Sequence, residues 1–302
     1  MGFRGPSMPS NFKEKNSIIA IGGSTTECYF ISDDKVWTQV MQDSLIKYDP
    51  TIWINNAGLN GHSTFGHNVL LEDIVAPLKP KYVLFLIGIN DVDRKDLGDF
   101  DKMAMQGTYV GNGWKEWLKT LSNNSELFNL FNNLIKAQNA KDKEIFVDKI
   151  WTLNPQDTIS ESKIYVVDYL KSLDPLVEEY ILRVASLDST CKANHITPIF
   201  ITQPILLGYG IDPVTGTDLA KYEYSKTLNG EFYWQKLEKY NSALLKYTKK
   251  NNSLSIDLAR LLPKSSQYYS DQMHYTNDGS IMVGNIIQNE FRSLTMQNKI
   301  VK

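Results

Sequence analysis

Short apolar runs alternate with longer amphipathic segments along the chain. Apolar runs rich in β-branched residues predict buried strands, whereas apolar residues that recur every three or four positions predict helices with one buried face. By these criteria we expect strands at 17–21, 51–55, 82–87, 196–202 and 254–258. We expect helices at 37–48, 64–78, 165–194, 232–251 and 276–294, with a break near Pro175 and with Thr276 or Asn277 as the final N-cap.

Three segments between these elements are less regular. Residues 114–140 carry apolar positions at helical spacing and predict one or two helices. Residues 142–160 are irregular, with a short strand or hairpin expected near 145–150. Residues 208–230 are rich in Gly, Pro, Thr and Tyr and predict a long loop.

Apolar strands separated by helices indicate a parallel sheet that is covered on both faces. The chain is therefore expected to form a three-layer α/β/α fold, a flavodoxin-like, doubly wound, five-stranded parallel sheet with helical inserts. We expect a single domain over 1–302, with an N-terminal extension at 1–16 and inserts at 93–168 and 204–230 flanking the active site. In this architecture ligands bind beyond the carboxyl ends of the strands.

Composition excludes several classes of function. The chain has 302 residues and a formal net charge of −2, without the basic stripe that nucleic-acid binding requires. No apolar run is long enough to span a membrane, and the N-terminus lacks the apolar core of a signal peptide. Cys28 and Cys191 are too few for a disulfide scaffold, so we expect two free thiols rather than a bridge.

The first predicted strand ends at Gly22-Gly23-Ser24, and these glycines allow a sharp turn that presents the serine hydroxyl. A helix N-cap or turn serine is the competing interpretation. Thr26 stands where the nucleophile elbow of α/β-hydrolases has its last glycine. The segment also lacks the Gly-Lys-Ser/Thr of a phosphate loop.

Candidate oxyanion donors follow the second and third strands. Gly58 and Gly61 lie in the segment after the second strand, and Asn90 follows Gly88 after the third. A glycine N–H and an asparagine amide both suit the stabilisation of a developing oxyanion. Each of these residues, taken singly, is also typical of an ordinary turn.

A candidate base lies near the C-terminus, just before the last predicted helix. Asp271 and His274 are three residues apart, so one short turn can place them side by side. Histidine is the usual base for a serine nucleophile, and a carboxylate sets its tautomer. A surface aspartate and a capping histidine are the alternative interpretation of this pair.

In combination, these segments resemble the four blocks of the SGNH (GDSL-like) hydrolase superfamily. The blocks are Gly-Gly-Ser-Thr-Thr, Asn-Ala-Gly-Leu-Asn-Gly, Gly-Ile-Asn-Asp and Asp-Gln-Met-His, in that order. The resemblance runs from about residue 18 to 288 and is absent in the middle of the chain. One departure is Gly23, because many members have Asp before the serine.

The resemblance implies a serine esterase without a cofactor or metal. It implies Ser24 as the nucleophile, His274 as the base and Asp271 as its orienting carboxylate. The oxyanion donors would be the N–H groups of Ser24 and Gly61 and the side-chain amide of Asn90, since block spacing favours Gly61 over Gly58. We expect cleavage of small acyl esters, acetyl first, on a small molecule or a glycan.

The substrate is expected to contact Thr25, His62, Tyr209 and Trp234. Aromatic residues in and after the 204–230 insert can stack on sugar rings, although ordinary packing is the competing interpretation. His62 and His67 are five apart, a poor spacing for two metal ligands on one helix face.

The stretch 2–6 (GFRGP) resembles segments that precede the serine block in envelope-associated bacterial members, downstream of a membrane anchor. That resemblance implies an excised ectodomain and an extracytoplasmic location, with the cytoplasm as the alternative. Three other functions stay open: acyl transfer to a polysaccharide by the same triad, a non-catalytic binding module on this scaffold, and a flavodoxin-like binding protein.

Overall fold

A computed structural model describes residues 3–96, 101, 152–159, 166–225 and 228–300, with side chains described up to 295. Five parallel strands form the central sheet: β1 (Asn16–Gly22), β2 (Ile52–Asn56), β3 (Tyr82–Ile87), β4 (Thr197–Thr202) and β7 (Leu254–Ile256). Their order, β2-β1-β3-β4-β7, is the flavodoxin-like order of a doubly wound fold. The expected fold class is confirmed.

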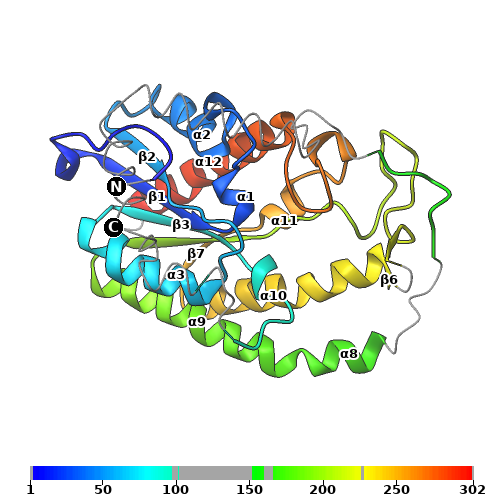
Figure 1. Cartoon of the computed structure of the whole chain (residues 1–302). Helices are drawn as coiled ribbons and strands as arrows, with labels where there is room; N and C mark the ends of the chain where they lie inside the picture. Colours follow the sequence, from blue (N-terminus) through cyan, green and yellow to red (C-terminus); the bar gives the residue numbers. More distant parts are fainter. Residues whose placement is uncertain (1–2, 97–100, 102–151, 160–165, 226–227, 301–302) are drawn as a thin grey trace, which may run out of the picture.

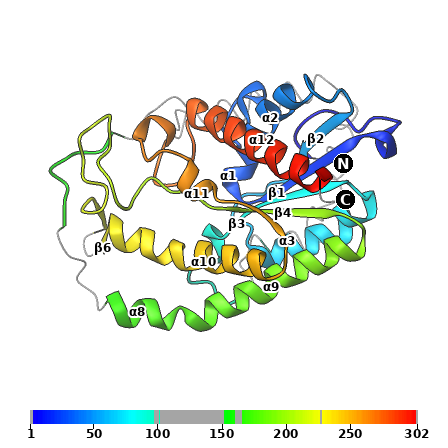
Figure 2. The same ribbon diagram turned by 180° about the vertical axis from the view of Figure 1, so that it is seen from behind.

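Helices cover both faces of this sheet (Figure 1). The described α-helices are α1 (Ser24–Glu27), α2 (Trp37–Leu45), α3 (Thr64–Leu70), α4 (Ala76–Leu78), α8 (Val166–Ser172), α9 (Asp174–Ala193), α10 (Gly230–Lys250), α11 (Leu258–Leu261) and α12 (Asn277–Ile300). Short 3-10 turns are η1 (Phe12–Glu14), η2 (Asp33–Lys35), η4 (Ile89–Asp91) and η5 (Ser266–Tyr268), and η3 (Leu71–Val75) is a π-helical turn. Figure 2 shows the same layers from behind, with α2 and α12 on one face and α3, α9 and α10 on the other.

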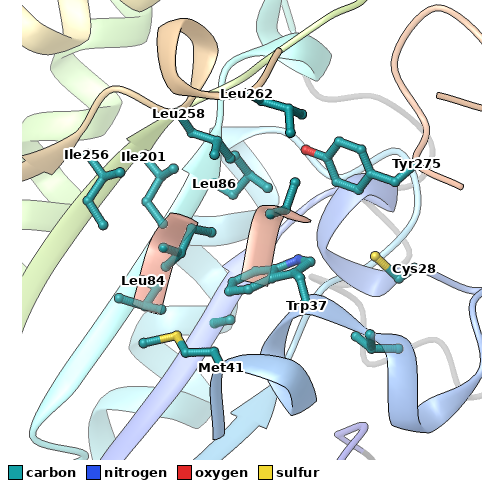
Figure 3. Packing of buried hydrophobic residues seen from close by; sticks show 14 of the residues in the cluster. Cys28, Trp37, Met41, Leu84, Leu86, Ile201, Ile256, Leu258, Leu262 and Tyr275 are labelled. Atoms are coloured by element: carbon teal, nitrogen blue, oxygen red, sulfur yellow. The ribbon is translucent and has the colours of Figure 1, made fainter. Parts of the chain in front are cut away.

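Alternation along the strands divides the core into two layers. In β3, Leu84 and Leu86 face α2 and α12, whereas Val83 and Phe85 face α3, α9 and α10. In Figure 3, Trp37 of α2 lies in the same cluster as Leu84 and Leu86, and it has no exposed surface. Because both faces are buried, the strands are mostly apolar, as the sequence pattern predicted, and polar residues such as Asn55 and Asn56 lie at the end of β2.

Most predicted elements are found within a few residues of their expected bounds. The strand at 82–87 is exact, the helix at 64–78 ends before Pro80 after a π-helical turn, and the helix at 165–194 breaks between α8 and α9 next to Pro175. The hydroxyl of Thr276 accepts from the N–H of Gly279 at 3.0 Å, so Thr276 is the N-cap of α12. Both cysteines are free and buried, as expected.

Two predictions need correction, and three others lie wholly or mostly outside the described residues. The 208–230 loop contains two short antiparallel strands, β5 (Glu223–Ser225) and β6 (Leu228–Asn229). The last strand of the sheet ends at Ile256 rather than Leu258, because Leu258 is the first residue of α11. The predictions for 114–140 and for the strand near 145–150, and most of the 93–168 insert, fall on residues that are not described.

Candidate active site

Ser24 is the first residue of α1, directly beyond the carboxyl end of β1. Close packing explains the two glycines before it. A Cβ atom on Gly22 would lie 2.2 Å from Oγ1 of Thr26, and one on Gly23 would lie 2.3 Å from Nδ2 of Asn90. Side chains at 22 and 23 would therefore displace α1 or Asn90. The amide of Asn90 therefore lies where a side chain at position 23 would begin.

Three side chains that are far apart in the sequence form a continuous hydrogen-bonded chain. Nε2 of His274 lies 2.8 Å from Oγ of Ser24, and Nδ1 of His274 lies 2.6 Å from Oδ2 of Asp271. Burial would raise the pKa of Asp271, but the hydrogen bonds and charge of His274 hold that pKa below its ordinary value. An ionised carboxylate therefore faces Nδ1, which favours a proton on Nδ1 and leaves Nε2 free to accept one from Ser24.

The turn that carries Asp271 and His274 is braced from several sides. Oδ1 of Asp271 accepts from the backbone N–H groups of Met273 and His274 at 2.8 and 2.7 Å. The N–H of Ser270 donates to the carbonyl of His274 at 2.8 Å. The N–H of Leu206, after β4, donates to the carbonyl of Gln272 at 2.9 Å. Hydrogen bonds within the turn, and one from the segment that follows β4, together hold the imidazole in place.

Asn90 lies on η4, beyond the carboxyl end of β3, which neighbours β1 in the sheet. Gly88 starts this turn at φ +125°, a backbone conformation that favours glycine. Nδ2 of Asn90 donates to the carbonyl of His62 at 2.9 Å. A side-chain amide carries two N–H bonds, so one remains to serve a second acceptor. Its contact with Gly23 places this amide against the Ser24 turn.

The two candidate glycines after β2 differ in what their backbones do. The N–H of Gly58 donates to Oδ1 of Asn56 at 2.9 Å, and a Cβ atom on Gly58 would lie 2.3 Å from the backbone nitrogen of Glu27. Gly58 therefore packs α1 against β2, and its N–H already has an acceptor. Gly61 adopts φ +72° just before His62, whose carbonyl contacts Asn90. This arrangement favours Gly61 as the donor.

Sequence reasoning did not identify the buried carboxylates that anchor the segment after Gly61. Asp91 accepts from the hydroxyl of Thr64 at 2.5 Å and faces Arg183 of α9 at 3.4 Å. Burial raises the pKa of Asp91 to about 6, against the opposing effect of these partners. Asp91 follows Asn90 directly, and this adjacency was the available sequence signal.

Asp101 anchors the same segment. It accepts from the N–H and hydroxyl of Ser63 at 2.9 and 2.8 Å, and from the N–H of Gly66 at 3.2 Å. It also accepts from Nη1 of Arg94 at 2.8 Å. Two carboxylates thus lie at the N-terminus of α3, where the helix dipole favours negative charge. Nothing in the sequence around Asp101 indicates this contact.

The four residues expected to contact substrate have different surroundings. Thr25 is buried and donates to Oε1 of Gln203 at 3.0 Å, and His62 is also buried. Trp234 is nearly buried beneath the ammonium of Lys264, which lies 4.2 Å from the ring centroid. Tyr209 is 58 % exposed. Of these four side chains, only Tyr209 presents a large surface to solvent.

A cavity of about 190 Å³ lies beside Asn90. Its two charged residues, Asp93 and Lys236, form an ion pair with each other. The remaining lining is mostly apolar and comes from η4, from α10 and from the turn before His274: Ile89, Asn90, Val92, Tyr233, Leu237 and Met273. In the described part of the chain, no helix is long and apolar enough to cross a membrane.

Comparison with known proteins agrees with this architecture. The model of the GDSL-like lipase/acylhydrolase family matches residues 20–158. An acetylxylan esterase from Geobacillus stearothermophilus has a similar structure, with a TM-score of 0.50 and 16 % identity over 91 % of this chain and 93 % of that chain. A GDSL-like lipase from Bacteroides thetaiotaomicron has a TM-score of 0.48 and 14 % identity over 96 % and 93 %. No protein of curated function matches the chain.

Proposed function

We propose that the chain, whose residues 20–158 match the model of the GDSL-like lipase/acylhydrolase family, is a carboxylic ester hydrolase that cleaves small acyl esters through an acyl intermediate on Ser24. The observation that carries this proposal is the hydrogen-bonded chain from Oγ of Ser24 through His274 to Asp271. A serine that merely capped α1 would have no need of a histidine at 2.8 Å that is itself oriented by a carboxylate.

In the proposed first half-reaction, Nε2 of His274 takes the proton of Ser24 while Oγ attacks the ester carbonyl carbon. The carbonyl oxygen gains negative charge, which the N–H groups of Ser24 and Gly61 and the amide of Asn90 stabilise. The N–H of Ser24 suits this role because the first-turn N–H groups of a helix have no acceptor within the helix. When the intermediate collapses, His274 protonates the departing alcohol, and the acyl group stays on Ser24.

In the second half-reaction, a water molecule replaces the alcohol. His274 takes a proton from that water, the resulting hydroxide attacks the acyl-serine, and the same donors stabilise the second tetrahedral intermediate. Collapse releases the carboxylic acid and returns the proton to Oγ of Ser24. Asp271 stabilises the imidazolium in both halves without becoming protonated.

For the substrate, we propose an acetyl or similarly small acyl group carried on a carbohydrate. The exposed ring of Tyr209, and the stacked pair of Tyr224 and Tyr233 with centroids 4.3 Å apart, support an aromatic surface near the site. The Geobacillus neighbour is an acetylxylan esterase, but at 16 % identity that likeness concerns the fold. The expected extracytoplasmic location stays a prediction.

The test is hydrolysis of p-nitrophenyl esters of increasing chain length and of acetylated xylo-oligosaccharides. We expect Ser24→Ala to abolish turnover and labelling by a fluorophosphonate probe, because both require Oγ. Ser189→Ala is the matched control, since Ser189 is an exposed serine on α9. Full activity in folded Ser24→Ala would overturn the proposed role of Ser24. A probe that fails to label the wild type would support a binding module, and transfer of acetyl to an added glycan would support an acyltransferase.

A further inference from the structure

The N-terminal segment runs antiparallel to the end of β2 (Figure 1). The N–H of Arg4 donates to the carbonyl of Asn56 at 2.9 Å, and the N–H of Asn56 donates to the carbonyl of Arg4 at 2.8 Å. The indole N–H of Trp53 donates to the carbonyl of Ser7 at 3.1 Å. The paired hydrogen bonds with Asn56 fix the backbone of Arg4 beside the carboxyl end of the sheet, whereas the Trp53 contact lies three residues further along the segment.

From this position the guanidinium of Arg4 reaches the far end of α1. Its Nη1 donates to the carbonyl oxygens of Glu27 and Cys28 at 3.1 and 2.5 Å, and its Nη2 donates to the carbonyl of Ile31. Its Nε donates to Oδ1 of Asp33 at 2.7 Å. Three of the four acceptors are backbone carbonyls at or just beyond the helix end, where carbonyls lack partners within the helix.

The helix held in this way carries Ser24 at its other end. α1 is a single turn of four residues, so its last carbonyls lie only about 5 Å along the axis from Ser24. Its backbone closures are few: the N–H groups of Thr26 and Glu27 donate to the carbonyl of Gly23, both at 3.0 Å, and the N–H of Cys28 donates to the carbonyl of Ser24 at 2.9 Å. Cys28 itself adopts φ +49°, a left-handed conformation that is uncommon for residues other than glycine. So short a helix depends on outside contacts for its position.

We infer that Arg4 is a positioning residue for the nucleophile: its guanidinium fixes α1 so that Oγ of Ser24 stays within reach of His274. This inference rests on the proposed role of Ser24. A planar fork of N–H donors can satisfy several carbonyls at once, which an ammonium cannot match. Asn56 assists through its Nδ2, which donates to the carbonyl of Thr26 at 2.6 Å.

The ion pair between Arg4 and Asp33 does not account for this function. The side chain of Asp33 is 83 % exposed, and ion pairs that are so exposed contribute little to stability. The side chain of Arg4 is 26 % exposed, which places its carbonyl contacts in a drier environment. The carbonyl contacts and the ion pair can therefore be tested separately.

The experiment compares kcat and KM of four variants on p-nitrophenyl acetate. We expect Arg4→Ala to lower kcat by about 10- to 100-fold with KM nearly unchanged, because displacing a reacting atom by about 1 Å can cost that much. Arg4→Lys should fall between Arg4→Ala and the wild type, and millimolar ethylguanidinium should partly restore kcat of Arg4→Ala. Asp33→Asn removes the ion pair, and Trp53→Phe removes the hydrogen bond to Ser7 while keeping an aromatic ring beside Phe12. Both controls should keep wild-type kcat.

Amide hydrogen exchange of residues 24–28 supplies a readout that does not depend on ester hydrolysis. Arg4→Ala should speed exchange there, whereas Asp33→Asn should not. Unchanged kcat or unchanged exchange in folded Arg4→Ala would overturn the inference, as would an equal loss of kcat in Trp53→Phe. If the wild type hydrolyses no ester but Arg4→Ala still speeds exchange, the proposed function fails while the contact between Arg4 and α1 stands.

Discussion

Replacing Asp271 by asparagine should invert the proton pattern of His274, the proposed base, while leaving the fold intact. Oδ1 of Asp271 accepts two backbone N–H groups, from Met273 and His274, at 2.8 and 2.7 Å. In Asp271→Asn the amide oxygen must take that position, because an NH₂ group there would face two donors. The NH₂ group is then directed at Nδ1 of His274, where Oδ2 lies at 2.6 Å in the wild type.

An imidazole that accepts a hydrogen bond at Nδ1 carries its proton on Nε2. Nε2 of His274 would then donate toward Ser24, 2.8 Å away, and could not accept the hydroxyl proton. The same exchange in a serine-protease triad lowers kcat about 10⁴-fold with the geometry intact. A loss of that size corresponds to about 5.4 kcal/mol of transition-state stabilisation, at 1.36 kcal/mol for each factor of ten.

The assay is steady-state hydrolysis of p-nitrophenyl acetate, with near-ultraviolet circular dichroism as the check on folding. KM should change little, because the substrate does not bind to Asp271 before the reaction. Asp278→Asn is the matched control, since it removes an exposed carboxylate seven residues away. Folded Asp271→Asn that kept a tenth or more of wild-type kcat would refute the reasoning about the tautomer.

Two further predictions address the oxyanion donor and a buried histidine. Asn90→Ala should stay folded and lose about 100- to 1,000-fold in kcat; loss of the folded state instead would indicate that its hydrogen bond to the carbonyl of His62 is structural. Burial, with His62 nearby, lowers the pKa of His67 to about 3 in the folded protein. In the unfolded chain this pKa is near 6.5, so between pH 6.5 and pH 3 His67 takes up a proton only when the chain unfolds. Stability from this group is therefore lost as pH falls, at about 1.4 kcal/mol per unit. In urea unfolding, His67→Leu should gain about 2 kcal/mol relative to wild type between pH 7 and pH 5, and parallel pH profiles would contradict this.

The sequence by itself determined the layers of the fold and the chemical nature of the site. A continuous apolar run such as Tyr82–Ile87 predicts a strand that is buried on both faces of a sheet, and this signal lies in the strand alone. Helical spacing likewise predicted α9, and Pro175 predicted its boundary with α8. These signals are local, so they can be recognised in one segment without its neighbours.

The ends of helices and strands depend on contacts that the spacing of apolar residues in the sequence does not indicate. α10 begins at Gly230, two residues earlier than expected, because the side chain of Asn229 accepts from the N–H of Phe232 at 3.0 Å. The segment before it contains β5 and β6, whose pairing joins residues that show no strand pattern of their own. Composition indicated a loop there and could not indicate which backbone groups would pair.

Only the tertiary structure decided how the proposed catalytic groups are held. Gly58 and Gly61 look alike in the sequence, but one N–H is committed to Asn56 and the other residue lies beside the Asn90 contact. Arg4 gave no chemical signal, yet its guanidinium meets the carbonyls at the end of α1. Such contacts join residues that lie far apart in the chain. Residue types therefore reveal which chemistry is available, whereas the distances that make it usable exist only once the sheet has assembled.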